Sequence, residues 1–274
     1  MTVDATPATA PSRHPPRAAS EAPRAFFNLD ALEMRYDPFP IGSVRPLMDE
    51  ARYTELLDYY PPRELFAYLP KVGHKYVLSE KFNGEEYQHF LRGNPVWREF
   101  HAWIKSDAFI RMIMRGLRDH HIDLGLGKTH SPMKQLWKSV KHTLNRNQKP
   151  QAARLSTRFE FSMLPADGGH IRPHTDVPAK IVTLVVSMTR DGEWDPAWGG
   201  ATEVNWPKDK RQIFNQLGEY LPFDAVDILD AYPFLSNQAV IFVKTFNSWH
   251  SVRPMTGHGT DAVRKTLTIN IEAR

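Results

Sequence analysis

The fold is decided by the run Arg264-Lys-Thr-Leu-Thr-Ile-Asn-Ile271. Beyond Lys265, the apolar residues Leu267, Ile269 and Ile271 alternate with polar ones, so an extended strand here has one apolar and one polar face. Three further runs, rich in Val, Ile, Thr and Phe, have the same strand character: 158–164, 180–188 and 239–246. Most connections between the runs lack the helix that parallel strands require. This half of the chain predicts an antiparallel barrel or a jelly roll of two sheets.

The first half of the chain has apolar residues at helical spacing between about residues 46 and 146. Trp97, Phe100 and Trp103 form one such set, and we interpret them as core. Ser106 or Asp107 is expected to cap the helix that follows. This spacing predicts a layer of helices packed on the β core.

The expected fold class is α+β, a jelly-roll core with a helical N-terminal layer. Residues 1–25 are rich in Ala and Pro and have few large apolar groups, which predicts a disordered tail. We expect residues 26–274 to form a single domain, in which 26–150 give mainly helical support and 151–274 form the catalytic core.

The composition excludes several kinds of site. The chain has no cysteine, so disulfides, thiolate metal sites and cysteine nucleophiles are excluded, and metal chemistry would need His and carboxylate ligands. The net charge of +4 comes from scattered basic residues, so no nucleic-acid partner is expected. No apolar run is long enough to span a bilayer and no secretory signal is evident, so we expect no membrane partner and a cytoplasmic location.

A candidate metal site lies in the stretch from Gly168 to Asp176. His174 and Asp176 are two residues apart just ahead of a strand, and in extended backbone their side chains share a face. Alone this pair is weak evidence for a metal, but His250 follows the apolar run 240–243 and can supply a third ligand. Two His and one carboxylate on one triangular face of an octahedron are typical of non-haem iron(II) oxygenases.

Arg264 is the candidate anion-binding residue. It shares the polar face of its strand with Thr266, Thr268 and Asn270. An arginine inside a barrel is costly without an anion, and its planar guanidinium matches a carboxylate with two parallel hydrogen bonds. A dicarboxylate ligand could bind along this polar face of the strand.

The order His-x-Asp, Gly-Gly, His-x-Val-x-Pro and Arg-x-x-Leu, over roughly residues 158–272, resembles the prolyl 4-hydroxylase-like branch of the 2-oxoglutarate and iron(II) oxygenases. This resemblance implies a double-stranded β-helix in which His174, Asp176 and His250 hold Fe(II). It also implies that Arg264 binds the distal carboxylate of the co-substrate 2-oxoglutarate, with O2 as the oxidant. Thr268 would assist Arg264.

Other contacts with 2-oxoglutarate are expected from the same resemblance. Thr183 belongs to a Val-Thr pair similar to one in the family, and Ser187 follows four residues later. The spacing between His250 and Arg264 looks longer than in relatives, which leaves Arg253 as a reserve for the carboxylate role.

The function implied is hydroxylation of an unactivated C–H bond with release of succinate and CO2. The substrate would be an amino acid, a peptide or another small metabolite, and the sequence does not choose among them or define the oligomeric state. Two alternatives stay open: a cupin-type metal-binding β-barrel that works without 2-oxoglutarate as an isomerase or dioxygenase, and an inactive binding module that keeps the fold. Substrate-dependent formation of succinate would distinguish the 2-oxoglutarate-dependent hydroxylase from both alternatives.

Overall fold

A computed structural model describes residues 25–125 and 155–273 of the chain. The predicted disordered tail, apart from Ala25, lies outside the described residues. Of the helices in the described residues, none is long and apolar enough to cross a membrane.

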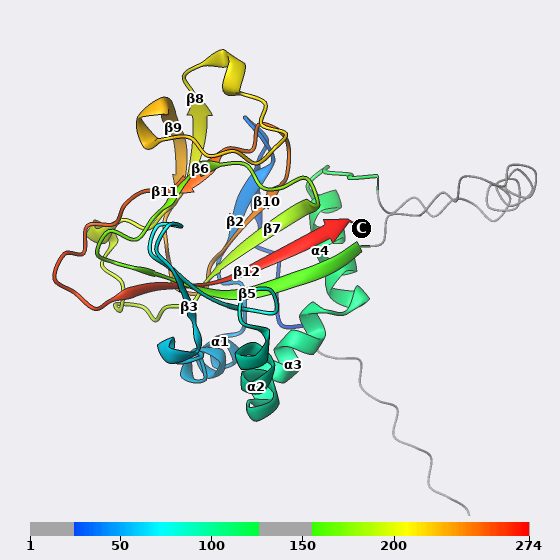
Figure 1. The fold of residues 1–274 in the computed structure, drawn as a ribbon. Helices are drawn as coiled ribbons and strands as arrows, with labels where there is room; N and C mark the ends of the chain where they lie inside the picture. Colours follow the sequence, from blue (N-terminus) through cyan, green and yellow to red (C-terminus); the bar gives the residue numbers. More distant parts are fainter. Residues whose placement is uncertain (1–24, 126–154, 274) are drawn as a thin grey trace, which may run out of the picture.

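Two antiparallel sheets form the core (Figure 1). The larger sheet has the strand order β1-β2-β10-β7-β12-β5-β4-β3, and the smaller has the order β6-β11-β8-β9. The strands of the larger sheet are β1 (Glu33–Arg35), β2 (Ile41–Val44), β3 (Ala67–Leu69), β4 (Lys75–Ser79), β5 (Leu155–Pro165), β7 (Lys180–Ser187), β10 (Ala239–Val243) and β12 (Val263–Ala273). Those of the smaller are β6 (Ile171–His174), β8 (Thr202–Pro207), β9 (Val226–Tyr232) and β11 (His250–Val252). The strand orders β10-β7-β12-β5 and β6-β11-β8-β9 confirm the predicted double-stranded β-helix, and the N-terminal half adds helices to it.

The N-terminal half contains more than helices. Its four short strands β1 to β4 extend both edges of the larger sheet, with β2 pairing with β10 and β4 pairing with β5. The apolar spacing in the sequence predicted mainly helix here. Strands of three to five residues carry too little alternation to be recognised, and their partners in the sheet stabilise them.

Between residues 25 and 125, four α-helices lie among the strands: α1 (Glu50–Asp58), α2 (Gly84–Gly93), α3 (Pro95–Ile104) and α4 (Asp107–Asp119). Asn94 and Ser106 cap α3 and α4, because their side-chain oxygens accept hydrogen bonds from Trp97 N and Phe109 N. Ser106 is one of the two expected caps. The helices cover one face of the larger sheet, as Figure 1 shows.

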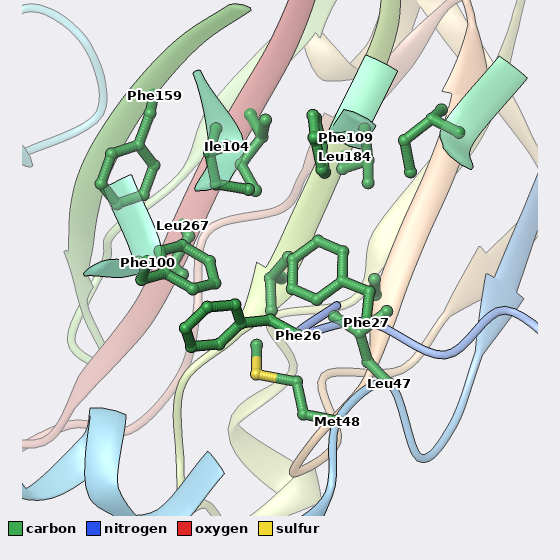
Figure 2. Packing of buried hydrophobic residues seen from close by; sticks show 14 of the residues in the cluster. Phe26, Phe27, Leu47, Met48, Phe100, Ile104, Phe109, Phe159, Leu184 and Leu267 are labelled. Carbon is green, nitrogen blue, oxygen red and sulfur yellow. The ribbon is translucent and has the colours of Figure 1, made fainter. Parts of the chain in front are cut away.

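Aromatic side chains join this helical layer to the sheet. Phe100, Ile104 and Phe109 from the helices meet Phe159 and other sheet residues in one buried cluster (Figure 2). On β5, alternation sends Phe159 and Phe161 into this core and leaves the polar residues between them on the opposite face. The core therefore fixes which side chains of the sheet face the interior of the barrel.

Truncating Trp97 tests this packing. The ring is fully buried, 4.7 Å from the Phe161 ring between centroids, and its Nε1 donates to Tyr59 O at 2.7 Å. We expect Trp97→Ala to lower the free energy of unfolding by about 3–5 kcal/mol, measured by urea denaturation. Phe214→Ala, at a side chain that is 71% exposed, should cost less than about 1 kcal/mol. Equal losses for the two variants would contradict this account of the core.

Candidate active site

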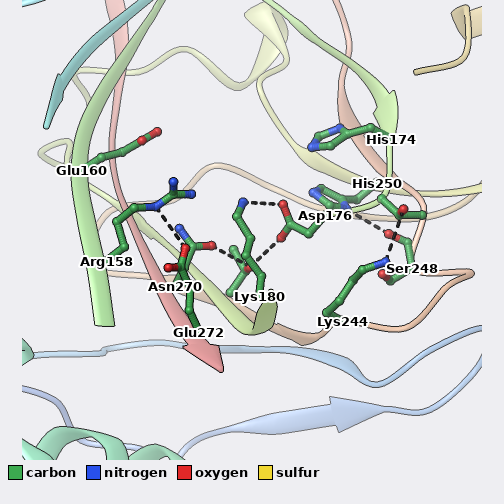
Figure 3. A network of polar contacts seen from close by, with 12 residues as sticks. Arg158, Glu160, His174, Asp176, Lys180, Lys244, Ser248, His250, Asn270 and Glu272 are labelled. Atoms are coloured by element: carbon green, nitrogen blue, oxygen red, sulfur yellow. Dashed lines mark hydrogen bonds and ion pairs between the residues drawn. The ribbon is translucent and has the colours of Figure 1, made fainter. Parts of the chain in front are cut away.

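Strand pairing brings together three potential metal ligands, His174, Asp176 and His250, which we call the triad. His174 ends β6 and His250 begins β11, and the two residues face each other in the antiparallel register. Their ring centroids are 4.4 Å apart. Asp176 follows in the next loop, and one potential ligand atom from each residue lies within 4.8 Å of the others (Figure 3).

The two histidines are oriented by backbone carbonyls. Nδ1 of His174 lies 2.9 Å from Arg172 O, and Nδ1 of His250 lies 3.0 Å from Ser248 O. With Nδ1–H donating to these carbonyls, the lone pair of each ring is at Nε2. Burial, and then the neighbouring His250, lower the pKa of His174 to about 3, and burial also lowers the pKa of His250. Both rings are therefore neutral at neutral pH, the form that binds metals.

Asp176 is buried and held from two sides. Lys180 Nζ forms an ion pair with Oδ1, and Thr183 Oγ1 donates to Oδ2 at 2.6 Å. Burial alone would raise the pKa of Asp176, but Lys180 and the two histidines outweigh it and lower the pKa. The carboxylate is therefore ionised at neutral pH.

The triad fits a divalent cation. Metal–ligand distances of about 2.0–2.2 Å place neighbouring ligand atoms about 3 Å apart, so small side-chain rotations would close the triad on one ion. Two neutral imidazoles and one carboxylate form the donor set of the iron(II) oxygenase type. In the described part of the chain, this is the group of His and acidic residues whose ligand atoms come together closely enough for such a site.

The triad opens onto a cavity of about 130 Å³ inside the barrel. Its walls combine the inward faces of β5, β7 and β12 with residues of the smaller sheet. Apolar side chains in the walls include Leu164, Ile171, Val185, Phe242 and Val252. The polar ones, apart from the triad, are Lys75, Arg158, Glu160, Ser162, Lys180, Thr183, Thr202, Ser251, Arg264, Thr266, Thr268 and Asn270.

Arg264 is a buried cation in this cavity. Its Nε donates to Gly200 O at 2.6 Å and its guanidinium lies 4.7 Å from the centroid of the Phe234 ring, while no carboxylate of the described residues pairs with it. Burial lowers the pKa of Arg264 to about 10, so the group stays charged at neutral pH. A buried charge without a counter-ion is costly, so an anion bound beside Arg264 would lower the free energy of this position.

The other expected residues divide into two groups. Thr268 and Thr183 line the cavity, but Thr183 uses its hydroxyl to hold Asp176. Ser187 is buried at the end of β7 and is not among the cavity-lining residues. Arg253 is 42% exposed, donates to Glu203 Oε1 at 2.9 Å and does not line the cavity, so the structure favours Arg264 over this reserve.

Lys180 is a residue that the sequence analysis missed. Simple alternation along β7 would put Lys180 and Thr183 on opposite faces. The β12–β7 pairing, however, passes from Ile271↔Val182 to Glu272↔Lys180, so β7 has an extra residue there. This bulge turns Lys180 into the cavity. The alternation of apolar and polar residues in the sequence does not indicate this bulge. The position of Lys180 at the start of the apolar run was the only sign of a polar group there.

The comparisons with known proteins agree with this chemistry. Residues 159–272 match the family model described as the 2OG-Fe(II) oxygenase superfamily. This segment of the chain is therefore similar to the 2OG-Fe(II) oxygenase superfamily. The oxygenase is a 2-oxoglutarate-dependent dioxygenase, and its cofactors are Fe(II), 2-oxoglutarate and O2, as the sequence analysis expected.

Three solved structures that match the chain are 11 to 13% identical to it. A prolyl-4-hydroxylase from Pseudomonas putida is 13% identical with a TM-score of 0.42, over 85% of the oxygenase and 92% of that chain. A prolyl hydroxylase from Trichoplax adhaerens, in complex with a hypoxia inducible factor peptide fragment, is 12% identical with a TM-score of 0.41, over 85% and 83%. The epimerase SnoN, in complex with Fe3+, alpha ketoglutarate and nogalamycin RO, is 11% identical with a TM-score of 0.45, over 87% and 80%. None of the curated proteins matches the oxygenase.

The hydrogen bond from Thr183 to Asp176 gives a test of the triad's support. Thr183→Val keeps the side-chain shape and removes the donor, so we expect metal affinity to fall about tenfold. Titration with Mn(II) measures the change. Thr268→Val, which removes a hydroxyl on the neighbouring strand β12, is the matched control and should leave metal affinity within about twofold. Equal affinity in the Thr183 variant and the wild type would show that this contact does not support the site.

Proposed function

We propose that the triad holds the iron of this oxygenase and that Arg264, assisted by Thr268, binds the distal carboxylate of 2-oxoglutarate. The observation that carries the proposal is that the triad and a buried arginine without a counter-ion line the same cavity. Iron with 2-oxoglutarate and O2 supplies the oxidation of a C–H bond to C–OH, while 2-oxoglutarate is converted to succinate and CO2. The protein's own groups bind, orient and limit access of water.

Each residue has a separate task in this proposal. The neutral rings of His174 and His250 and the ionised carboxylate of Asp176 would hold the ion at the wall of the cavity. Lys180 and Thr183 orient the carboxylate of Asp176. The apolar wall residues exclude bulk water from the side of the ion where the chemistry occurs. Direct contacts of Thr183 and Ser187 with 2-oxoglutarate stay predictions.

The substrate is proposed only as a class: an amino acid, a peptide or another small metabolite whose C–H bond is hydroxylated. We also expect a cytoplasmic enzyme without nucleic-acid or membrane partners. Two of the similar solved structures are prolyl hydroxylases, and one of them is in complex with a peptide fragment. Neither transfers a substrate to this chain.

Anaerobic titration tests the proposal. Iron(II) followed by 2-oxoglutarate should produce a metal-to-ligand absorption band in the visible region, because the co-substrate chelates iron. The band should saturate at one equivalent of each. A band that fails to form with 2-oxoglutarate, although iron binds, would favour the cupin-type reading, in which the triad binds metal without this co-substrate.

A further inference from the structure

A row of polar side chains crosses the sheet from the far wall of the cavity to the triad. Arg158 on β5 is directly opposite Asn270 on β12, and Asn270 is directly opposite Thr183 on β7. The Asn270 side-chain amide lies 3.0 Å from Thr183 Oγ1, and Thr183 in turn holds Asp176. Figure 3 shows Arg158 and the triad on opposite sides of Lys180 and Asn270. The triad therefore faces an arginine across the cavity.

The separation between the ends of this row suits a small molecule. β5 and β7 are two strand spacings apart in the sheet, which is about 10 Å between their backbones. The Arg158 side chain extends into the space between them. The hydrogen bond from Thr183 to Asp176 joins the β7 end of this row to the triad, so a small molecule held by Arg158 would extend toward the triad.

The guanidinium of Arg158 has capacity for a ligand. Its Nε lies 3.3 Å from Glu272 Oε1 without the geometry of a hydrogen bond. Within residues 25–125 and 155–273, nothing accepts a hydrogen bond from either of its Nη atoms, although both are donors. The two Nη groups are free to bind a carboxylate by the parallel pair of hydrogen bonds that suits arginine.

The charged side chains that line the cavity also have an excess of positive charge. Four cations line the cavity, Lys75, Arg158, Lys180 and Arg264, against the two carboxylates Glu160 and Asp176. Iron(II) and doubly charged 2-oxoglutarate neutralise each other, so they do not change this excess of two positive charges. Glu272 beside Arg158 removes one of the two. One positive charge remains for the primary substrate to neutralise.

We propose that Arg158, with Asn270 beside it, binds a free carboxylate of the primary substrate. The substrate is accordingly a small organic acid with its oxidised carbon a few bonds from the carboxylate, and not a residue inside a polypeptide. This inference rests on the proposed function, in which the triad holds the metal and Arg264 takes 2-oxoglutarate. It assigns the two cavity arginines to two different acids.

The test uses butyrate and its neutral analogue butyramide as probes. The full-length enzyme is loaded with paramagnetic Mn(II) and saturating 2-oxoglutarate, so that no turnover occurs and the Arg264 site is filled. Proton relaxation of each probe then reports binding near the metal. A charge-assisted pair of hydrogen bonds should give butyrate at least about tenfold tighter binding than butyramide.

Variants separate the two arginines. Arg158→Gln should reduce butyrate binding to the level of butyramide while changing 2-oxoglutarate affinity less than about twofold, and Arg158→Lys should restore part of it. Asn270→Ala should weaken butyrate binding independently. Arg253→Gln, at an exposed arginine outside the cavity, should behave as the wild type.

Three outcomes would overturn the inference. Equal relaxation of butyrate and butyramide in the wild type would show that no carboxylate is preferred, and a preference unchanged in Arg158→Gln would place the carboxylate elsewhere. In both cases 2-oxoglutarate binding persists and the proposed function stands. Failure of the wild type to bind Mn(II) or 2-oxoglutarate would overturn the proposed function together with this inference.

Discussion

The His174→Ala variant should lose tight iron binding and turn over 2-oxoglutarate at least about 1,000-fold more slowly than the wild type. Such a loss corresponds to about 4 kcal/mol of transition-state stabilisation. The physical reason is that Nε2 of His174 is one of three ligands, and two remaining ligands hold a divalent ion poorly. Iron content after dialysis and succinate formation measure the two effects.

The control for this variant is His170→Ala. His170 lies on the same segment and its Nδ1 contacts Gly168 O, but it is outside the triad. We expect its iron content to equal that of the wild type. His174 is half-buried, so its replacement should leave the fold intact, and circular dichroism checks this. Retention of one tightly bound iron by His174→Ala would remove this residue from the metal site.

The Arg264→Gln variant should require roughly 30-fold or more 2-oxoglutarate for half-saturation, while iron affinity changes little. Loss of one partner of a buried, hydrogen-bonded charge pair costs about 2–5 kcal/mol, which corresponds to a factor of about 30 or more. Half-saturation is read from the anaerobic absorption band. Arg253→Gln is the matched control, because Arg253 is paired with Glu203 outside the cavity.

The free energy of unfolding of the Arg264→Gln variant provides a second, independent test. Without 2-oxoglutarate, Arg264 is a buried charge with no carboxylate partner among the described residues, so its removal should leave the free energy of unfolding unchanged or raise it. Added 2-oxoglutarate should stabilise the wild type and not Arg264→Gln. If the variant is strongly destabilised without ligand and keeps its affinity for 2-oxoglutarate, the arginine has a structural role instead.

The β core was predictable because its strands are long and alternate. In β12 the apolar residues Leu267, Ile269 and Ile271 are fully buried and the polar residues between them line the cavity, as the alternation of the sequence predicts. The strands β1 to β4 were not predictable, because each is short. The strands β2 and β4 depend on pairing with β10 and β5, which are far away in the sequence, and β1 and β3 add to them at the sheet edges. The proposed division into a helical support and a catalytic core stays a prediction.

The sequence predicted those parts of the candidate site in which the spacing of residues along the chain determines the positions of the side chains. His174 and Asp176 are close in the chain, and the order of motifs pointed to His250, which pairing of β6 and β11 brings alongside. The positions that depend on irregular or long-range contacts were not accessible. Lys180 reaches the cavity because of a bulge in β7. Arg253 forms an ion pair with Glu203, which is fifty residues away in the sequence.

A crystal structure of the enzyme with Mn(II) and 2-oxoglutarate tests the central claim most directly. The account predicts one metal ion within about 2.0–2.3 Å of a His174 nitrogen, an Asp176 oxygen and a His250 nitrogen, with the distal carboxylate of 2-oxoglutarate hydrogen-bonded to Arg264. A metal held by other residues, or 2-oxoglutarate bound away from Arg264, would contradict it.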